Sequence, residues 1–248
     1  MEVGPASLLL AIETAGSGCS AAILRDGEVL AAECRAIRYG HAEALLPMVD
    51  RVARAACVEP GDLRLVAVAT GPGGFTGIRA GLAAAQGIAL GTGALLVGVT
   101  SFAAVAAAVR VRGLGCRAAP LLVALDSRRD DLYVQLFAAN CATPLAEPAS
   151  LLPDRLASHV AGPVGCTKLL IAGDRAELAA EALGRERRVG LVPDSAPDAL
   201  GVAAAALLAL EAGAVPGITV SAPVRPLYLR PPDVTLPKGK RLGPVAVQ

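Results

Sequence analysis

Two acidic residues, each at the end of an apolar run, are the first candidates for chemistry in this sequence. Glu13 ends the run LLLAI, and Asp126 ends the run LLVAL. A pair of carboxylates beside a cleft can organise a divalent cation and a water molecule for phosphoryl transfer. The alternative is that both side chains cap the turns that follow their strands and bind nothing. The residue types alone leave both interpretations open.

A glycine-rich segment offers a second kind of site. It reads TGPGGFTGIRAGL from Thr70 to Leu82 and lies between an apolar run and a helical pattern. Backbone N–H groups at such a strand-to-helix turn can bind an anion, and Arg79, one turn into the helix, could assist. The segment lacks the Gly-Lys-Ser/Thr ending of a Walker loop, so a tight turn without a ligand is the simpler interpretation. The candidate residues of this signature loop are Gly71, Pro72, Gly73, Phe75, Thr76, Gly77 and Arg79.

The histidines and cysteines do not suggest a metal site. His41 and His159 lie far apart, on different expected helices, whereas two imidazoles that share an ion from one helix lie on adjacent turns. We therefore expect no metal, and we expect His41 to be an ordinary residue at the start of a helix. The six cysteines are widely spaced without a C-x-x-C pair, which favours buried thiols in a reducing compartment over disulfides.

The composition excludes several classes of protein. The 248 residues are 54% apolar and 18% charged, which excludes a disordered chain. The net charge of +1 argues against a stand-alone nucleic-acid binder, which needs a basic surface to displace counterions. The first apolar run is too short for a signal peptide and follows Glu2 rather than basic residues. We expect a cytoplasmic protein that does not enter a membrane.

The elements that position these residues alternate as in an α/β fold. Three short apolar runs separated by glycine-containing turns predict an antiparallel meander. A helical period then begins at His41, and further strands alternate with helices, which implies parallel strands with crossover helices. The expected elements are strands 7–14, 19–25 and 29–37, helix 41–57, strand 65–69, helix 78–90, strand 94–99 and helix 101–111.

The second half of the sequence repeats the opening of the first half. The run LLVALDS from Leu121 matches LLLAIET from Leu8 in character at every position, and a polar turn and a second strand follow each run. Chance similarity between two apolar strands is the alternative. We expect two lobes, 1–117 and 118–248, with the last helix and the Pro-rich, basic tail packing back on the first lobe. The second lobe should contain strand 131–138, helix 151–160, strand 168–172, helix 175–183, strand 188–192, helix 198–212 and an extended tail from 222.

The string GPGGFTGIRAGLAAAQGIALG closely resembles the signature of the TsaB family, also called YeaZ. The resemblance extends to LLLAIETAGSGCSAAIL at the start, HAEALLPMVDRV, VGVTSFAAVA, ALDSRRDDLYVQLF and PLYLR near the end, whereas residues 139–210 match only in outline. It implies the duplicated two-lobe α/β fold of the actin, sugar-kinase and chaperone-ATPase (ASKHA) superfamily, with mixed β-sheets flanked by helices. This implication agrees with the internal repeat.

Three positions depart from the family pattern. The usual first-strand Asp is Glu13, the usual Ser of the signature is Gly74, and the usual Ala-Arg-x-Gly-Glu is replaced by SRRDD at 127–131. The short sequence IAGD at 171–174 also stands where a superfamily ATPase has a longer glycine-rich adenosine loop. The resemblance therefore implies no cofactor, or ATP or ADP bound only at a partner interface. The candidate degenerate nucleotide site comprises Glu13, Thr14, Asp126 and Gly173.

The resemblance also implies a role in making N6-threonylcarbamoyladenosine in tRNA. The implied role is a non-catalytic scaffold that dimerises with and activates the catalytic paralogue TsaD, together with the ATPase TsaE. The family also forms homodimers through the surface that binds TsaD, and tRNA would be contacted only through the complex. An ATP-dependent enzyme of the ASKHA superfamily, an ATPase or a kinase, is the alternative function.

Small residues after the signature predict where a partner would dock. A stripe of glycine and alanine recurs every four residues on the helix that follows it, so another backbone could approach, or the stripe could pack on the protein's own sheet. If the stripe is a surface, Gly81→Leu or Ala85→Phe should abolish association and leave the monomer folded. The expected interface comprises Leu45, Met48, Val49, Val52, Gly77, Gly81, Ala85 and Ala89.

Overall fold

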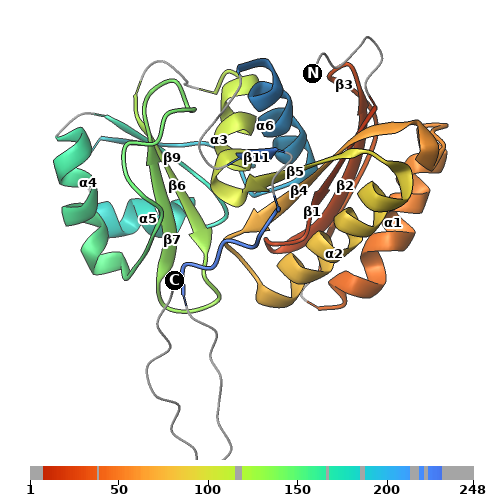
Figure 1. Ribbon diagram of the computed structural model, residues 1–248. Coiled ribbons are helices and arrows are strands. Elements are labelled where there is room, and N and C mark those ends of the chain that lie inside the picture. The colour runs from red at the N-terminus through yellow and green to blue at the C-terminus, as the bar shows by residue number, and fades with distance from the viewer. Residues whose placement is uncertain are drawn as a thin grey trace, which may run out of the picture.

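The computed structural model describes residues 8–37, 39–114, 119–165, 168–184, 188–212, 218–220 and 223–230. Within these residues two lobes lie side by side, and each is a mixed β-sheet flanked by helices (Figure 1). This arrangement confirms the expected two-lobe α/β fold. None of the described helices is long and apolar enough to cross a lipid bilayer.

The first lobe is built on a six-stranded sheet with the order β11-β5-β4-β1-β2-β3. Its strands are β1 (Leu8–Glu13), β2 (Gly18–Arg25), β3 (Glu28–Ala36), β4 (Leu63–Gly71), β5 (Leu95–Thr100) and β11 (Ile218–Val220). The first three strands form the predicted antiparallel meander, and β1, β4 and β5 run parallel. Asp26 and Gly27, between β2 and β3, both have positive φ angles, as a two-residue hairpin turn requires.

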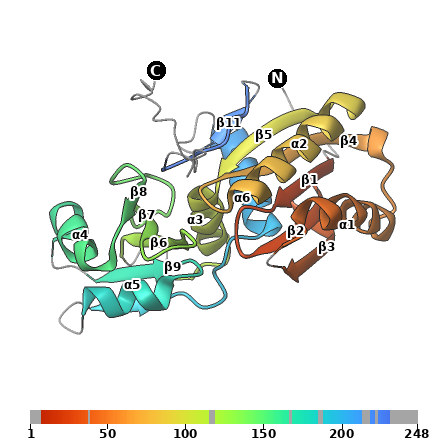
Figure 2. The same cartoon turned by 90° about the horizontal axis from the view of Figure 1, so that it is seen from below.

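Described helices cover both faces of this sheet (Figure 2). Helices α1 (His41–Ala55) and α2 (Phe75–Thr92) lie on one face, and α3 (Ser101–Val111) and α6 (Ala199–Ala212) lie on the other. The periodic apolar residues of α1, among them Leu45, Met48 and Val52, are buried against the sheet. The helical period in the sequence therefore marks the core side of α1, as expected for an amphipathic helix.

The second lobe repeats the topology of the first around a five-stranded sheet with the order β10-β9-β6-β7-β8. Strand β6 pairs with the next strand antiparallel and with β9 parallel, as β1 pairs with β2 and β4. The sequence repeat thus reflects a structural duplication. Its elements are β6 (Leu121–Asp126), β7 (Leu132–Phe137), β8 (Ala149–Leu151), α4 (Leu156–Val164), β9 (Leu169–Ala172), α5 (Ala176–Leu183) and β10 (Val189–Leu191).

Helix α3 is buried on nearly all sides because both lobes pack against it. Ala103, Ala104 and Ala107 belong to the core of the first lobe, whereas Phe102 and Val105 belong to a core shared with β6 and β7. Its alanine side also lets α6 approach closely: a Cβ on Gly201 would lie 2.7 Å from the carbonyl oxygen of Ala104. The alanine-rich composition is therefore used where helices meet between the lobes.

The end of the described chain returns to the first lobe. Strand β11, which the sequence did not predict, pairs with β5 at the sheet edge. After it Val224 is buried, and the N–H of Leu227 donates to the carbonyl of Thr70 at 2.8 Å. The predicted last helix, α6, packs on the first sheet as well. The basic residues of the tail at 238, 240 and 241 lie outside the described residues.

Two expected helices begin three or more residues away from their predicted starts. The helix expected at 151–160 begins at Leu156, because Leu152 precedes a proline and is held extended, and Pro153 then opens a short 3-10 turn. The residues before it form β8, which pairs with β7. The signature helix begins at Phe75 rather than near 78, so part of the signature loop lies in the first turn of α2.

The stripe of small residues on α2 faces the protein's own core, which corrects the expected interface. A Cβ on Gly77 would lie 2.0 Å from the carbonyl oxygen of Thr14, and one on Gly81 would lie 2.3 Å from the Thr14 hydroxyl. Gly81→Leu or Ala85→Phe would overfill this core, so we now expect both substitutions to destabilise the monomer itself. Of the expected interface, Leu45, Met48, Val52, Gly77, Gly81, Ala85 and Ala89 are buried and Val49 is half-buried.

Two glycine substitutions on α2 should have opposite effects on stability. Gly77→Ala should lower the free energy of unfolding by about 1–3 kcal/mol, because the new methyl group meets backbone that cannot move aside. Gly87→Ala should raise it by about 0.5–1 kcal/mol, because a Cβ there meets no atom within 4 Å and alanine favours the helix. Urea denaturation of both variants measures the difference; equal effects would contradict the packing described here.

Candidate functional site

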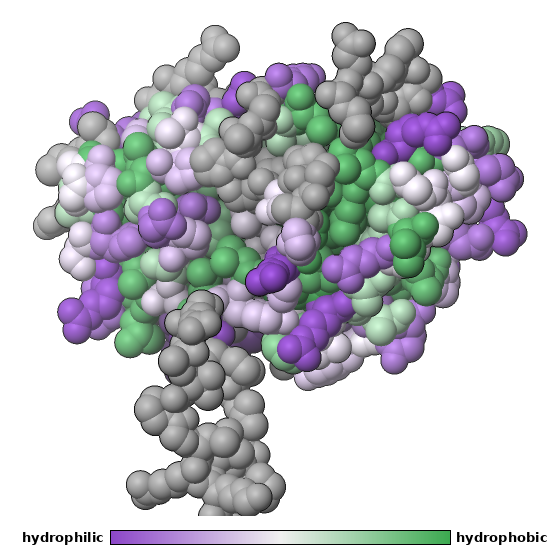
Figure 3. All heavy atoms as spheres, in the orientation of Figure 1, coloured by the Kyte–Doolittle hydropathy of each residue, from purple (hydrophilic) through white to green (hydrophobic). Residues whose placement is uncertain are grey.

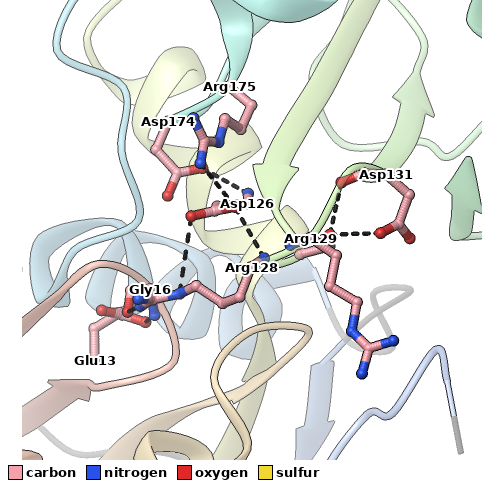
Figure 4. A network of polar contacts seen from close by, with 9 residues as sticks. Glu13, Gly16, Asp126, Arg128, Arg129, Asp131, Asp174 and Arg175 are labelled. Atoms are coloured by element: carbon pink, nitrogen blue, oxygen red, sulfur yellow. Dashed lines mark hydrogen bonds and ion pairs between the residues drawn. The ribbon is translucent and has the colours of Figure 1, made fainter. Parts of the chain in front are cut away.

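The candidate site lies where the turn after β1 meets the turn after β6, between the lobes (Figure 4). Glu13 is 1% exposed, and its carboxyl group accepts the N–H groups of Ala15 at 2.7 Å and Gly16 at 2.8 Å. Thr14 donates its hydroxyl hydrogen to the carbonyl of Gly77. Glu13 therefore holds its own turn in place, and Thr14 ties that turn to α2.

The surroundings of Glu13 favour its uncharged form. Burial raises the pKa of this carboxyl to about 8, with Asp174 and Asp198 adding repulsion, although the bonds from Gly16 and Ala15 partly oppose the change. Glu13 is therefore mostly protonated at neutral pH. A protonated carboxyl binds a divalent cation poorly, and no cluster of three or more His, Cys, Asp or Glu suited to a metal ion occurs among the described residues.

Asp126 is held by arginines. One of its carboxylate oxygens lies 3.0 Å from the guanidinium of Arg175 and accepts the backbone N–H of Arg128 at 2.9 Å. Its own backbone N–H donates to Asp174, whose pKa is raised mainly by burial. Asp126 thus neutralises neighbouring cations and organises the turn after β6.

Arg128 connects the two turns. Its guanidinium donates to the carbonyl of Gly16 at 2.8 Å and lies 3.8 Å from the carboxylate of Asp126 (Figure 4). The fold therefore brings Glu13 and Asp126 to the same region, but an arginine side chain lies between their turns. Sequence reasoning did not select Arg128 as a functional residue, although the departure at 127–131 marks its position.

Gly173 is required by backbone geometry. Its φ angle is +110°, and a Cβ there would lie 2.1 Å from the carbonyl oxygen of Ala124. A cavity of about 660 Å³ opens beside it. The charged residues that line this cavity are mainly acidic and would repel the phosphates of a nucleotide; they are Asp174, Glu177, Glu181 and Asp194, with Arg175 as the described cation.

The signature loop packs tightly against the turn after β1. The N–H of Gly74 donates to the carbonyl of Ala15 at 2.7 Å, and a Cβ on Gly73 would lie 2.1 Å from that oxygen. The peptide bond between Gly71 and Pro72 is cis. These contacts explain the glycines of the loop without a ligand.

Arg79 does not take the expected position of an anion-binding residue. Its guanidinium lies over the ring of Phe75, 3.7 Å from the centroid, and its Nε donates to the hydroxyl of Tyr228 at 3.1 Å. Phe75 and Tyr228 stack with their ring centroids 5.3 Å apart. Arg79 and Phe75 therefore hold the C-terminal segment around Tyr228 against α2.

A cavity of about 340 Å³ separates the signature loop from the second lobe, and its lining includes Arg128, Arg129 and Arg230. Arg230 pairs with the buried Asp131. Burial opposes ionisation of Asp131, but hydrogen bonds from Ser150 and Ser127 and the charge of Arg230 lower its pKa overall. Asp131, just before β7, and Arg230, in the C-terminal segment, form an ion pair. Sequence reasoning missed this pair because the partners are distant in the chain.

Comparison with known proteins places the chain among proteins of tRNA modification. The family model described as "TsaD: tRNA N6-adenosine threonylcarbamoyltransferase" matches residues 35–165. The chain is 36% identical to the tRNA threonylcarbamoyladenosine biosynthesis protein TsaB of Escherichia coli over 126 residues, which are 50% of this chain and 52% of that protein. It is 32% identical to an uncharacterized protein of Mycobacterium tuberculosis over 92% of this chain and 93% of that protein. The match thus spans about half the length of the Escherichia coli relative.

Solved structures agree with this placement. YeaZ from Pseudomonas aeruginosa superposes with a TM-score of 0.75 at 26% identity, over 90% of this chain and 100% of that chain. Component A of the (R)-2-hydroxyglutaryl-CoA dehydratase of Acidaminococcus fermentans superposes with a TM-score of 0.51 at 13% identity, over 83% of this chain and 98% of that chain. The second likeness concerns the fold alone.

The buried carboxyl of Glu13 should make stability depend on pH. Because its pKa is raised in the folded state, its contribution is complete below the unfolded value of 4.5 and is lost as pH rises through about 8. The free energy of unfolding should therefore fall between pH 5 and pH 8, on the order of 1.4 kcal/mol per unit of pKa shift. Glu13→Gln keeps an acceptor for both N–H groups and should flatten this slope. Urea titrations at several pH values measure it, and parallel slopes for both proteins would refute the assignment.

Proposed function

The chain belongs to the TsaB (YeaZ) family of tRNA threonylcarbamoyladenosine biosynthesis proteins, and we propose that it acts there as a non-catalytic scaffold subunit. In this proposal it dimerises with a TsaD-type catalytic subunit and activates it, with a TsaE-type ATPase as a further partner. Contact with tRNA occurs through the complex. The chain also forms homodimers through the surface that receives the catalytic subunit.

The observation that carries the proposal is the bridge formed by Arg128. Phosphoryl transfer requires carboxylates that can hold a cation beside the phosphates. Here Asp126 is neutralised by arginines, Glu13 favours its protonated form, and Arg128 extends from one turn to the other. The acidic lining of the cavity beside Gly173 points in the same direction. These features support a scaffold over an active ATPase or kinase.

The outer surface of α1 and α2 is the docking surface in this proposal. Leu90 is 88% exposed and Leu46 is 54% exposed, on two helices that pack against each other. Ala83 and Gly87, on the exposed side of α2, leave room for a partner helix to approach closely. Figure 3 shows apolar patches among strongly polar ones on the molecular face that includes α2. This surface replaces the buried stripe that the sequence suggested.

Reconstitution of the modification tests the role directly. With TsaD-type and TsaE-type proteins, threonylcarbamoyl-adenylate, ATP and tRNA, formation of the modified nucleoside should require this chain. The isolated chain should show no ATP turnover, because Glu13 favours its uncharged form and Asp126 is paired with Arg175. Nucleoside analysis by mass spectrometry and a phosphate-release assay provide the two readouts. ATP turnover by the chain alone would favour the enzyme alternative.

A charge placed on the proposed surface should weaken association. Leu90→Glu should reduce binding of the TsaD-type subunit by about tenfold or more, since a carboxylate would lose its water in an apolar contact. Leu152→Glu serves as the matched control, because Leu152 is 52% exposed on the second lobe. Circular dichroism first verifies that both variants are folded. Size-exclusion chromatography with light scattering then measures the association of each variant with the TsaD-type subunit. Equal effects of the two variants would refute the surface.

A further inference from the structure

We infer that a cavity between His41 and the start of α2 binds a phosphate group. The cavity has a volume of about 240 Å³, several times the roughly 30 Å³ of one water molecule. Its lining includes His41, Arg128 and the first residues of α2, Phe75, Thr76 and Gly77. The inference does not depend on the proposed scaffold function.

The imidazole of His41 provides the observation that points to a ligand. His41 is only 8% exposed, and its Nε2 atom is buried without a hydrogen-bond partner. A buried polar atom without a partner costs free energy, and because His41 also lines a cavity, a ligand bound there would supply the missing partner. The expectation that His41 is an ordinary helix-start residue does not account for this atom.

The unpartnered side of the ring lies next to the signature helix. A Cβ on Gly77 would lie 3.6 Å from Cδ2 of His41, the ring carbon bonded to Nε2. Nε2 thus lies close to the first turn of α2. Because Nε2 is closed off from water, a ligand in the cavity reaches it only after a small rotation of the imidazole or of a neighbouring side chain.

The start of α2 attracts anions. The helix is 18 residues long, its N-cap is Gly74, no side chain caps its first turn, and that turn has no acidic residue. Its first N–H groups have no partners within the helix, and the aligned peptide dipoles place about half a positive charge at this end. An oxyanion in the cavity would satisfy several of these donors.

The charges around the cavity add to this preference. None of the described residues that line it is acidic, and Arg128 contributes a positive charge that Asp126, 3.8 Å away, offsets only in part. Burial and the charge of Arg128 lower the pKa of His41, against the opposing effects of the Gly18 carbonyl and Glu43. An anion placed between Arg128 and His41 would relieve this repulsion and favour the protonated ring, in which both nitrogens donate.

The geometry favours phosphate over carboxylate. Three separate segments with donor groups line the cavity: the first turn of α2, Arg128 and His41. A tetrahedral phosphate has oxygens for all three, whereas a planar carboxylate has only two. The cavity also has room for a group attached to the phosphate. Free phosphate and a phosphate monoester therefore share the required chemistry.

Titration of the imidazoles tests the inference without an activity assay. The chain has only two histidines, so both can be followed by ¹H–¹⁵N NMR spectra of the full chain as a function of pH. Inorganic phosphate should raise the pKa of His41 by about half a unit or more relative to chloride at equal ionic strength. His159, whose Nε2 is also unpartnered but which lines no described cavity, should not respond. No change at His41, or equal changes at both rings, would overturn the inference.

Two variants and two further ligands refine the test. Arg128→Gln should weaken phosphate binding about tenfold through loss of a charge-assisted hydrogen bond, whereas the matched charge control Arg64→Gln, near the 3-10 turn before β4, should not. Unchanged His159 signals verify that each variant is folded. Stronger binding of adenosine monophosphate than of phosphate would identify a monoester as the ligand, and the reverse order would identify the free ion. Acetate binding as strong as phosphate binding, or an equal loss of phosphate binding in the two variants, would refute the phosphate site.

Discussion

The structure depends on backbone-to-backbone contact between the signature helix and the turn after β1. Positions 73, 77 and 81 carry glycine because the carbonyl oxygens of Thr14 and Ala15, or the Thr14 hydroxyl, occupy the space of a side chain. Two hydrogen bonds, from Gly74 to Ala15 and from Thr14 to Gly77, close the same contact. The signature is therefore explained by packing, and its conformational demands fix the turn on which the candidate site is built.

That fixed turn determines what the space between the lobes can do. With the Ala15–Gly16 turn held by Glu13 on one side and the signature loop on the other, the carbonyl of Gly16 points to the second lobe and receives Arg128. The result is a hydrogen-bonded arginine side chain where an enzyme of this fold would need free carboxylates. The same turn leaves the first N–H groups of α2 and the imidazole of His41 facing a second, smaller cavity. The packing of α2 on the turn after β1 thus places Arg128 in the site between the lobes and also shapes the cavity beside His41.

Much of the fold could be predicted because each signal was local. The meander, the alternation of strands and helices and the duplication are visible in short runs of residues, and each predicted strand between Leu8 and Asp126 is present. The errors arose where a local signal was weak or ambiguous. Three-residue strands such as β8 and β11 have no period of their own and are stabilised by their neighbours. The sequence singled out Glu13 and Asp126, but the contacts of Arg128 with Gly16 and of Arg175 with Asp126 depend on chain segments that meet only after folding.

The sequence by itself determined the duplicated α/β topology, the signature and the family, because these are written in residue types at fixed spacing. Only the tertiary structure decided which face of α2 is outside. A small residue every four positions is equally suited to a partner's backbone or to the protein's own, and the Thr14 backbone occupies that face here. The charge state of Glu13 was likewise decided by folding, since burial removes the water that would stabilise its anion. Spacing along a chain specifies which residues share a face, whereas packing specifies what that face meets.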